Sequence, residues 1–118
     1  MKSKLKRLKD KAWNTFSLFI RKRDKRCVTC GSTKSLQAGH YWHAVLDFDE
    51  MNINAQCAGC NHFKSGNLAV YASYLIVKYG SKKFKELEIR HYRAMKGEKR
   101  SEQDYEEIIR HYKDLLGE

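Results

Sequence analysis

Two pairs of cysteines carry the clearest chemistry in this sequence. They read CVTC and CAGC, at Cys27 and Cys30 and at Cys57 and Cys60, with 26 residues between them. Each C-x-x-C pair presents two thiolates from one tight turn, and two such turns can enclose one zinc ion in a tetrahedral shell. A closed shell of four thiolates leaves no position for a substrate, so we predict one structural zinc per chain.

Disulfide bonds and redox-active dithiols are the alternatives for these cysteines. The apolar stretch FSLFI is five residues long, too short for a signal-peptide core or a membrane span. We therefore expect a cytoplasmic protein without a membrane partner, where disulfides are rare. A redox role would need a thioredoxin-like context around one pair, and the sequence has none.

His40 lies in the stretch AGHYWH, between the two pairs. If four thiolates fill the zinc shell, this histidine is free for another role. A neutral imidazole, with an ordinary pKa of about 6.5, is suited to take a proton from water. The simpler interpretation is a structural histidine between aromatic residues. Two asparagines also have ordinary alternatives, since Asn52 could be a turn residue and Asn61, directly after Cys60, could cap a helix.

The order of these residues resembles the HNH nucleases, whose ββα-metal motif is often built on a four-cysteine zinc scaffold. In particular, AWNTFSLFIRKRD, AGHY, FDEMNINAQCAGCN and YLIVKYG are similar to phage recombination endonucleases of the Rap/NinG type. The resemblance covers roughly residues 12–80. It implies cleavage of DNA phosphodiester bonds, with branched intermediates such as Holliday junctions or D-loops as substrates, in the cytoplasm of a phage host.

Site roles follow from the same resemblance. His40 would be the general base, Asn52 would brace the loop of the motif, and Asn61 would bind a catalytic Mg²⁺ or Mn²⁺. Many HNH enzymes have a second metal ligand immediately before the base, where this chain has Gly39. Asn61 would then be the sole protein ligand, or a replacement would come from one of the nearby side chains Asp47, Asp49, Glu50 and His43.

The positive charge of the chain is concentrated at its start. Residues 1–26 contain eleven Lys and Arg against two Asp, so this segment carries +9 of the formal net charge of +10. Such a one-sided charge is typical of nucleic-acid binding, although a solvated basic helix is the simpler outcome. The side chains that we expect to contact phosphates are Lys4, Arg7, Lys11, Lys22, Arg23 and Lys64.

The apolar spacing predicts a mainly helical α+β domain. Leu5, Leu8, Ala12, Phe16 and Ile20 recur every three or four residues, which predicts a basic helix within residues 1–26. Residues 27–80 would form the zinc-stabilised ββα-metal core, with short strands in SLQAGHYW and MNINAQC and a helix ending at Gly80. Residues 81–118 would form two helices, and the stripe from Tyr105 to Leu116 is expected to be core, or less simply a homodimer seam.

Three functions remain open from the sequence. The first is a metal-dependent HNH endonuclease acting on branched DNA. The second is a non-selective DNA nicking endonuclease with the same chemistry. The third is a non-catalytic, zinc-containing DNA-binding module, which would need neither His40 nor Asn61 for cleavage.

Overall fold

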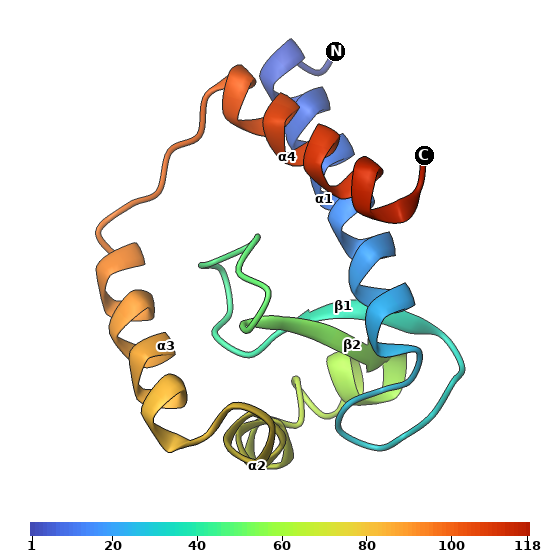
Figure 1. Cartoon of the computed structure of the whole chain (residues 1–118), viewed down its shortest axis with the longest axis vertical. Helices are drawn as coiled ribbons and strands as arrows, with labels where there is room; N and C mark the ends of the chain where they lie inside the picture. The colour runs from blue at the N-terminus through green and yellow to red at the C-terminus, as the bar shows by residue number, and fades with distance from the viewer.

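The computed structural model describes residues 1–118 as a mainly helical protein with one small sheet (Figure 1). This confirms the predicted α+β class. No helix combines the length and the apolar character that crossing a membrane requires. The elements in chain order are α1 (Lys4–Asp24), β1 (Leu36–His40), β2 (Ile53–Cys57), the short π-helix η1 (Gly59–Phe63), α2 (Leu68–Tyr79), α3 (Ser81–Ala94) and α4 (Glu102–Leu116).

Helix α1 begins and ends at clear capping residues. The Ser3 hydroxyl accepts a hydrogen bond from the Lys6 amide, and Lys25 adopts a left-handed conformation that closes the last turn. Its apolar stripe, Ala12, Phe16 and Ile20, is fully buried against the hairpin and α4. The basic residues are left on the remaining faces, as the spacing predicts.

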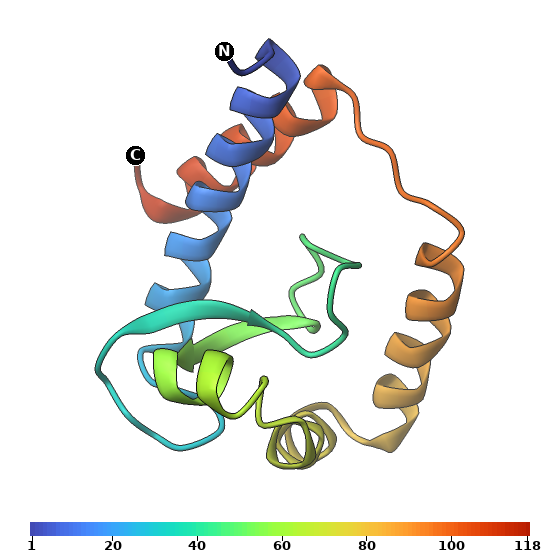
Figure 2. The same ribbon diagram turned by 180° about the vertical axis from the view of Figure 1, so that it is seen from behind.

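The strands β1 and β2 form an antiparallel hairpin whose two faces have different partners. Ala38 pairs with Ala55, and His40 pairs with Ile53, on the face that packs against Phe16 and Ile20 of α1. Gln37 and Gly39 alternate to the opposite face. Figure 2 shows α1 above the hairpin, with η1 and α2 below it.

Tyr71 of α2 joins the lower face of the hairpin to a buried polar network. Its hydroxyl donates to the Gly39 carbonyl at 2.7 Å and accepts from Asn54 Nδ2 at 3.1 Å. The side chain is fully buried, and burial raises the pKa of Tyr71, so the hydroxyl stays neutral. The hydroxyl thus bonds a strand carbonyl and a buried side-chain amide at the same time.

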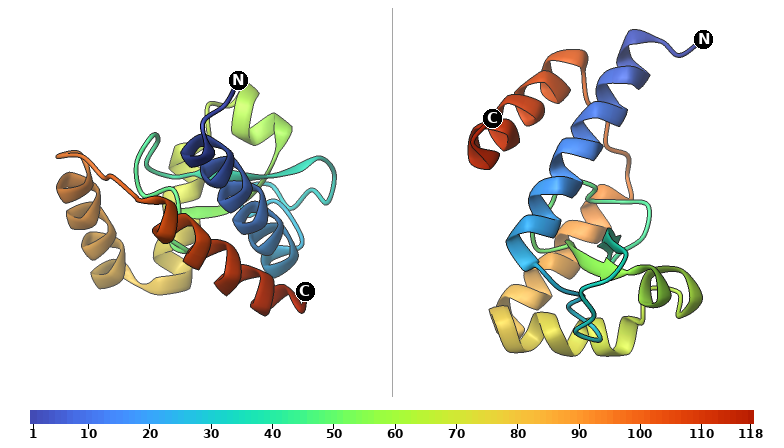
Figure 3. Two further views of the ribbon diagram at one scale, coloured as in Figure 1. Left: turned by 90° about the horizontal axis from the view of Figure 1, so that it is seen from above. Right: turned by 90° about the vertical axis from the view of Figure 1, so that its right-hand side faces the viewer.

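The C-terminal helices divide between the two sides of the molecule. Helix α3 packs against α2, where Leu87 joins a core with Tyr71 and Leu75. Helix α4 returns to the N-terminus and lies beside α1 (Figure 3). The predicted stripe buries Tyr105, Ile109 and Tyr112 within the same chain.

We predict that Tyr71→Phe destabilises the protein by about 1–3 kcal/mol, because it removes the hydroxyl that binds the Gly39 carbonyl and one N–H of the Asn54 amide, whose other bond goes to the Met51 carbonyl. Urea unfolding in zinc-containing buffer measures this. Tyr74→Phe is the matched control, since its hydroxyl accepts only from the exposed Lys78. Equal midpoints for the two variants would contradict the role given to the Tyr71 hydroxyl.

Candidate functional site

The four cysteines converge at the end of the hairpin that lies away from His40. Their sulfur atoms all lie within 4.8 Å of one another, with Cys27 and Cys60 buried, Cys57 half-buried and Cys30 exposed. Zinc–sulfur bonds of about 2.3 Å place tetrahedral thiolates about 3.8 Å apart, which these positions match closely. The donor set therefore fits a structural zinc ion, as the spacing predicts.

Two of the sulfurs have shifted pKa values, in opposite directions. At Cys30 a backbone hydrogen bond from Ser32 lowers the pKa, but contacts with the other three sulfurs raise it to about 12. Burial opposes ionisation of Cys27, but hydrogen bonds from the Thr29 hydroxyl and from backbone amides lower its pKa to about 6. Cys60 lies 3.7 Å from the Asn67 side-chain amide, and its own backbone N–H donates to the Cys57 sulfur at 3.4 Å. Thiolate is the form that binds metal, so these contacts prepare the site.

His40 ends strand β1 on the face of the hairpin that α1 covers. The Trp13 ring stacks on the imidazole with 5.3 Å between ring centroids, and Nε2 lies 2.9 Å from Asp47 Oδ1. Nδ1 forms no hydrogen bond within the protein. A cavity of about 240 Å³ opens beside the ring, lined by Lys6, Lys9, Asp10, Trp13, His40, Asp47 and Phe48.

Asp47 is the carboxylate that holds His40. The hydrogen bond from His40 is the main cause that lowers the pKa of Asp47, against the opposing effect of burial, and Arg100 and Lys9 add favourable charge. The carboxylate therefore stays ionised and accepts the Nε2 proton. The imidazole then has its lone pair on Nδ1, which is the nitrogen without a protein partner.

Asn52 fixes the loop that carries Asp47. Its Oδ1 accepts from the Trp42 amide at 2.8 Å, and its Nδ2 donates to the carbonyls of Trp42 and Val45, both at 3.1 Å. The side chain is fully buried. These bonds link the Asn52 side chain to both ends of the turn after β1.

Asn61 lies in η1 on the other face of the hairpin. Its Nδ2 donates to Gln37 Oε1 at 2.8 Å, and Gln37 alternates away from the α1 face that holds His40. The structure therefore does not bring Asn61 to His40. The four cysteines are the only group of three or more His, Cys, Asp or Glu side chains close enough to share an ion. The groups around His40 thus do not fit a preassembled Mg²⁺ or Mn²⁺ site that includes Asn61.

The residues considered as replacements for a ligand at Gly39 have separate partners. Asp49 binds Arg90 at 2.9 Å, and Glu50 accepts from the Tyr112 hydroxyl at 2.9 Å. The His43 ring lies parallel to His40 with 6.4 Å between centroids. Of these four side chains, only that of Asp47 forms a hydrogen bond with His40.

Gly39 has a packing reason to lack a side chain. A Cβ atom there would lie 2.1 Å from Gln56 Oε1. Gln56 is fully buried, and its Nε2 donates to the Gly66 carbonyl at 2.7 Å, while Oε1 has no hydrogen-bond partner. The space beside Gly39 is therefore already occupied.

The predicted phosphate-binding residues are spread over several surfaces. Arg23 binds Asp24, Asn54 Oδ1 and two carbonyls, so it is committed to holding the hairpin and we do not assign it to DNA. Lys4 lies 3.6 Å from Glu102, and Arg7 donates to the Lys2 carbonyl. The remaining side chains are exposed, namely Lys11, Lys22 and Lys64.

The sequence analysis missed the residues that surround His40. Lys6, Lys9 and Trp13 line its cavity from one side of α1. Their spacing of three and four residues is a signal for a shared helix face, which could have been read from the sequence. Asp47 was considered only as one of four possible metal ligands, because its contact with His40 depends on the path of the loop between them.

Comparison with known proteins assigns the family. The family model described as Bacteriophage Lambda NinG protein matches residues 1–118. This chain belongs to the NinG family. It is 42% identical over 90 residues to Protein ninG of Escherichia phage 933W, covering 70% of this chain and 45% of that protein. The proteins of the same name from Salmonella phage P22 and Escherichia phage lambda are 42% and 41% identical, over 70% of this chain and 44% of each.

The chain therefore spans about half the length of the curated relatives it matches. No solved structure matches it significantly. The expected membership of the HNH nuclease family is wrong, because the model that matches the whole chain is that of NinG. The histidine and asparagine spacing suggested a shared HNH site, but alternation along β1 separates His40 from Asn61.

We predict one zinc ion per folded chain and loss of the fold in Cys57→Ser, because the four thiolates supply about 10–16 kcal/mol of apparent metal-binding energy in small domains. Elemental analysis of reduced protein measures the zinc content, and circular dichroism with and without a chelator follows the fold. Ser73→Ala, at an exposed serine on α2, is the control for zinc lost during purification. A folded, reduced protein without zinc would contradict the prediction.

Proposed function

We propose that this NinG family protein hydrolyses phosphodiester bonds in DNA, with His40 as the general base and branched recombination intermediates as substrates. The observation that carries the proposal is the His40–Asp47 contact of 2.9 Å beside a cavity lined with lysines. A structural histidine needs no carboxylate and no open cavity. A proton acceptor needs both an orienting partner and access to water.

The chemistry follows from the two nitrogens of the imidazole. Nε2–H donates to the Asp47 carboxylate, which fixes the ring and its tautomer. Nδ1 then takes the proton of a water molecule as that water attacks phosphorus, and the imidazolium is stabilised by Asp47. Trp13 restricts rotation of the ring from one face. Magnesium or manganese would stabilise the leaving oxygen when bound, and the protein ligand expected for it, Asn61, lies on the other face of the hairpin.

The lysines of the cavity suit the phosphate backbone of the substrate. Lys9 forms no ion pair, whereas Lys6 binds Asp10 at 2.8 Å. Hydrogen bonds from Lys2 and Lys6 lower the pKa of Asp10 to about 2, so part of the local positive charge is neutralised. Lys9 is therefore the cation freest to contact a phosphate next to the His40 ring.

A second candidate function is a non-catalytic DNA-binding module stabilised by zinc. The exposed basic side chains on the outer face of α1, such as Lys11 and Lys22, favour DNA binding with or without cleavage. Such a module would retain its affinity for DNA when His40 is replaced. A non-selective nicking enzyme would cleave linear and branched DNA at similar rates.

We predict that His40→Ala lowers cleavage of a four-way DNA junction and of supercoiled DNA by about 10²–10⁴-fold, because it removes the proton acceptor. Cleavage is measured with Mg²⁺ or Mn²⁺ present, and junction binding is measured separately without a divalent cation. His111→Ala, an exposed histidine on α4, is the matched control.

Binding should be unchanged in the His40→Ala protein, because the imidazole is not a phosphate ligand in this scheme. Equal cleavage by the variant would refute the base assignment. Absence of cleavage by the wild-type protein on every DNA form, with binding intact, would favour the non-catalytic module.

We predict that Asp47→Asn lowers the cleavage rate at least about 10²-fold, because an amide no longer stabilises the imidazolium or fixes the tautomer. Single-turnover rates at saturating junction DNA separate this effect from binding. Asp114→Asn on α4 is the matched control. An unaltered rate would show that Asp47 serves only the fold.

A further inference from the structure

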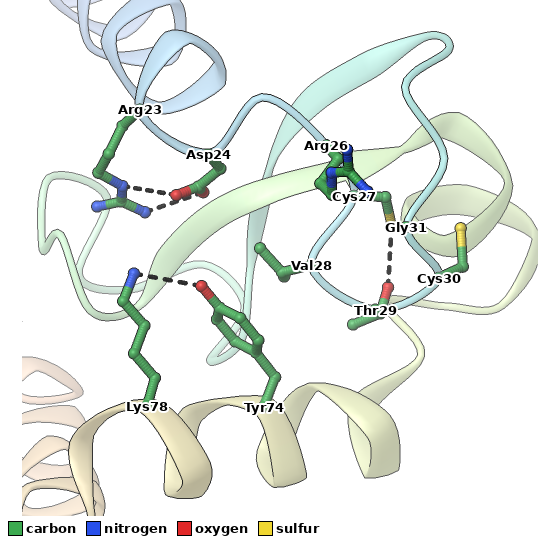
Figure 4. A pocket seen from close by; sticks show the side chains of 10 residues that line it. All are labelled: Arg23, Asp24, Arg26, Cys27, Val28, Thr29, Cys30, Gly31, Tyr74 and Lys78. Atoms are coloured by element: carbon green, nitrogen blue, oxygen red, sulfur yellow. Dashed lines mark hydrogen bonds and ion pairs between the residues drawn. The ribbon is translucent and has the colours of Figure 1, made fainter.

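The largest cavity of the protein lies far from His40. Its volume is about 580 Å³, and it is bounded by the end of α1, the first cysteine turn and helix α2. Figure 4 shows Lys78 and Tyr74 of α2 facing Arg23 and the cysteine turn across this space. The cavity is open to solvent, and nothing in the catalytic proposal uses it.

The one carboxylate of the cavity, Asp24, already has its hydrogen bonds satisfied, and the sulfurs of Cys27 and Cys30 belong to the predicted zinc site. Asp24 accepts from Arg23 at 2.8 and 3.0 Å and from the Ala55 amide at 2.8 Å, and its side chain is only 4% exposed. The guanidinium of Arg23 is occupied by its contacts with Asp24 and the hairpin. This pair neutralises itself and anchors α1 to the hairpin, so neither residue determines the charge that a ligand would meet.

Two cations remain free to bind a ligand. Arg26 is exposed and forms no hydrogen bond or ion pair. Lys78 donates to the Tyr74 hydroxyl at 3.2 Å, and its ammonium lies 5.6 Å and 5.3 Å from the ring centroids of Tyr74 and Tyr79. The aromatic rings hold the ammonium at the cavity without cancelling its charge. The Tyr74 hydroxyl accepts from Lys78, so its own proton can be donated to an anion.

We infer that this cavity binds the phosphodiester backbone of a nucleic acid, through Arg26, Lys78 and the Tyr74 hydroxyl. Neighbouring phosphates of one backbone offer the acceptor oxygens that two cations and a hydroxyl require. An acidic peptide could meet the same cations, but the cavity adjoins the helix that carries +9 within residues 1–26, a charge density suited to a polyanion. The inference rests on the proposed function only in taking DNA as the partner.

The position of the cavity agrees with a second contact on the same DNA. Lys9 and Arg23 mark the two cavities along α1, and fourteen residues of helix span about 21 Å. Phosphates follow one another by about 3.4 Å along the axis for each strand, so this distance corresponds to about six phosphates. The separation of the two cavities along α1 is therefore no longer than a backbone segment of about six phosphates.

The test measures binding, so it does not depend on cleavage. Affinity of the Arg26→Ala/Lys78→Ala protein for a short fluorescent DNA duplex is titrated against salt in buffer without a divalent cation. We expect the slope of log affinity against log salt to flatten by about 1.8, because two phosphate contacts of about 0.9 each are lost. Arg26→Lys/Lys78→Arg keeps both charges and should restore most of the slope.

The matched control is Lys85→Ala/Arg110→Ala, which removes two exposed cations from α3 and α4. Zinc content and thermal unfolding are compared for all variants. An unchanged slope with normal zinc content overturns the inference. Lost zinc affinity without any change in slope also overturns it, since Arg26 would then only balance the thiolate charge. Weakened binding of polyglutamate with unchanged DNA binding would assign the cavity to an acidic protein instead.

Failure of this inference is distinguishable from failure of the proposed function. If the wild-type protein binds DNA through these cations as expected but never cleaves it, the assignment of the cavity stands and the proposed nuclease activity is wrong. If the protein cleaves DNA but the salt slope is the same with and without the Arg26 and Lys78 charges, the proposed nuclease activity stands and the assignment of the cavity to DNA is wrong.

Discussion

A two-stranded hairpin cannot stabilise itself in water, so the fold depends on covering both of its faces. Helix α1 covers one face with Phe16 and Ile20. Tyr71 covers the other face and satisfies the polar backbone there. The cysteines hold the open end, and Asn52 holds the turn. Because side chains alternate between the two faces of a strand, each one packs either against α1 or against the side that Tyr71 covers. His40 lies on the face covered by α1.

The helix that covers the hairpin also supplies the surroundings of the histidine. Lys9 and Trp13 are one turn apart on α1, so the positive charge and the stacked ring reach His40 from the same surface. Helix α4 keeps α1 in place through Tyr105 and Ile109, which pack with Ala12. The C-terminal helix thus supports the candidate site through α1 and through Phe48, which lines the cavity and whose ring centroid lies 6.2 Å from that of Tyr105.

Most of the fold could be predicted because its signals are local. The four-residue spacing of Ala12, Phe16 and Ile20 identifies the buried face of α1, and the C-x-x-C spacing identifies the metal cluster. The site was harder to predict, because a shift of one residue along a strand moves a side chain to the other face of the sheet. Asn61 and His40 are separated in this way. The path of the loop that carries Asp47 depends on the long-range hydrogen bonds of Asn52, for which the sequence has no local pattern.

Gly39 and Gln56 explain why the carboxylate beside His40 comes from a loop. The Gln56 side chain occupies the space where any Cβ at position 39 would lie, and its amide reaches the Gly66 carbonyl and the Thr29 hydroxyl. A side chain at position 39 would displace Gln56 and break the link between the hairpin and the first cysteine turn. An acidic residue immediately before His40 is therefore excluded by packing. Asp47 reaches the histidine from the α1 side, where a cavity lies beside it and where His40, Arg100 and Lys9 favour its charge.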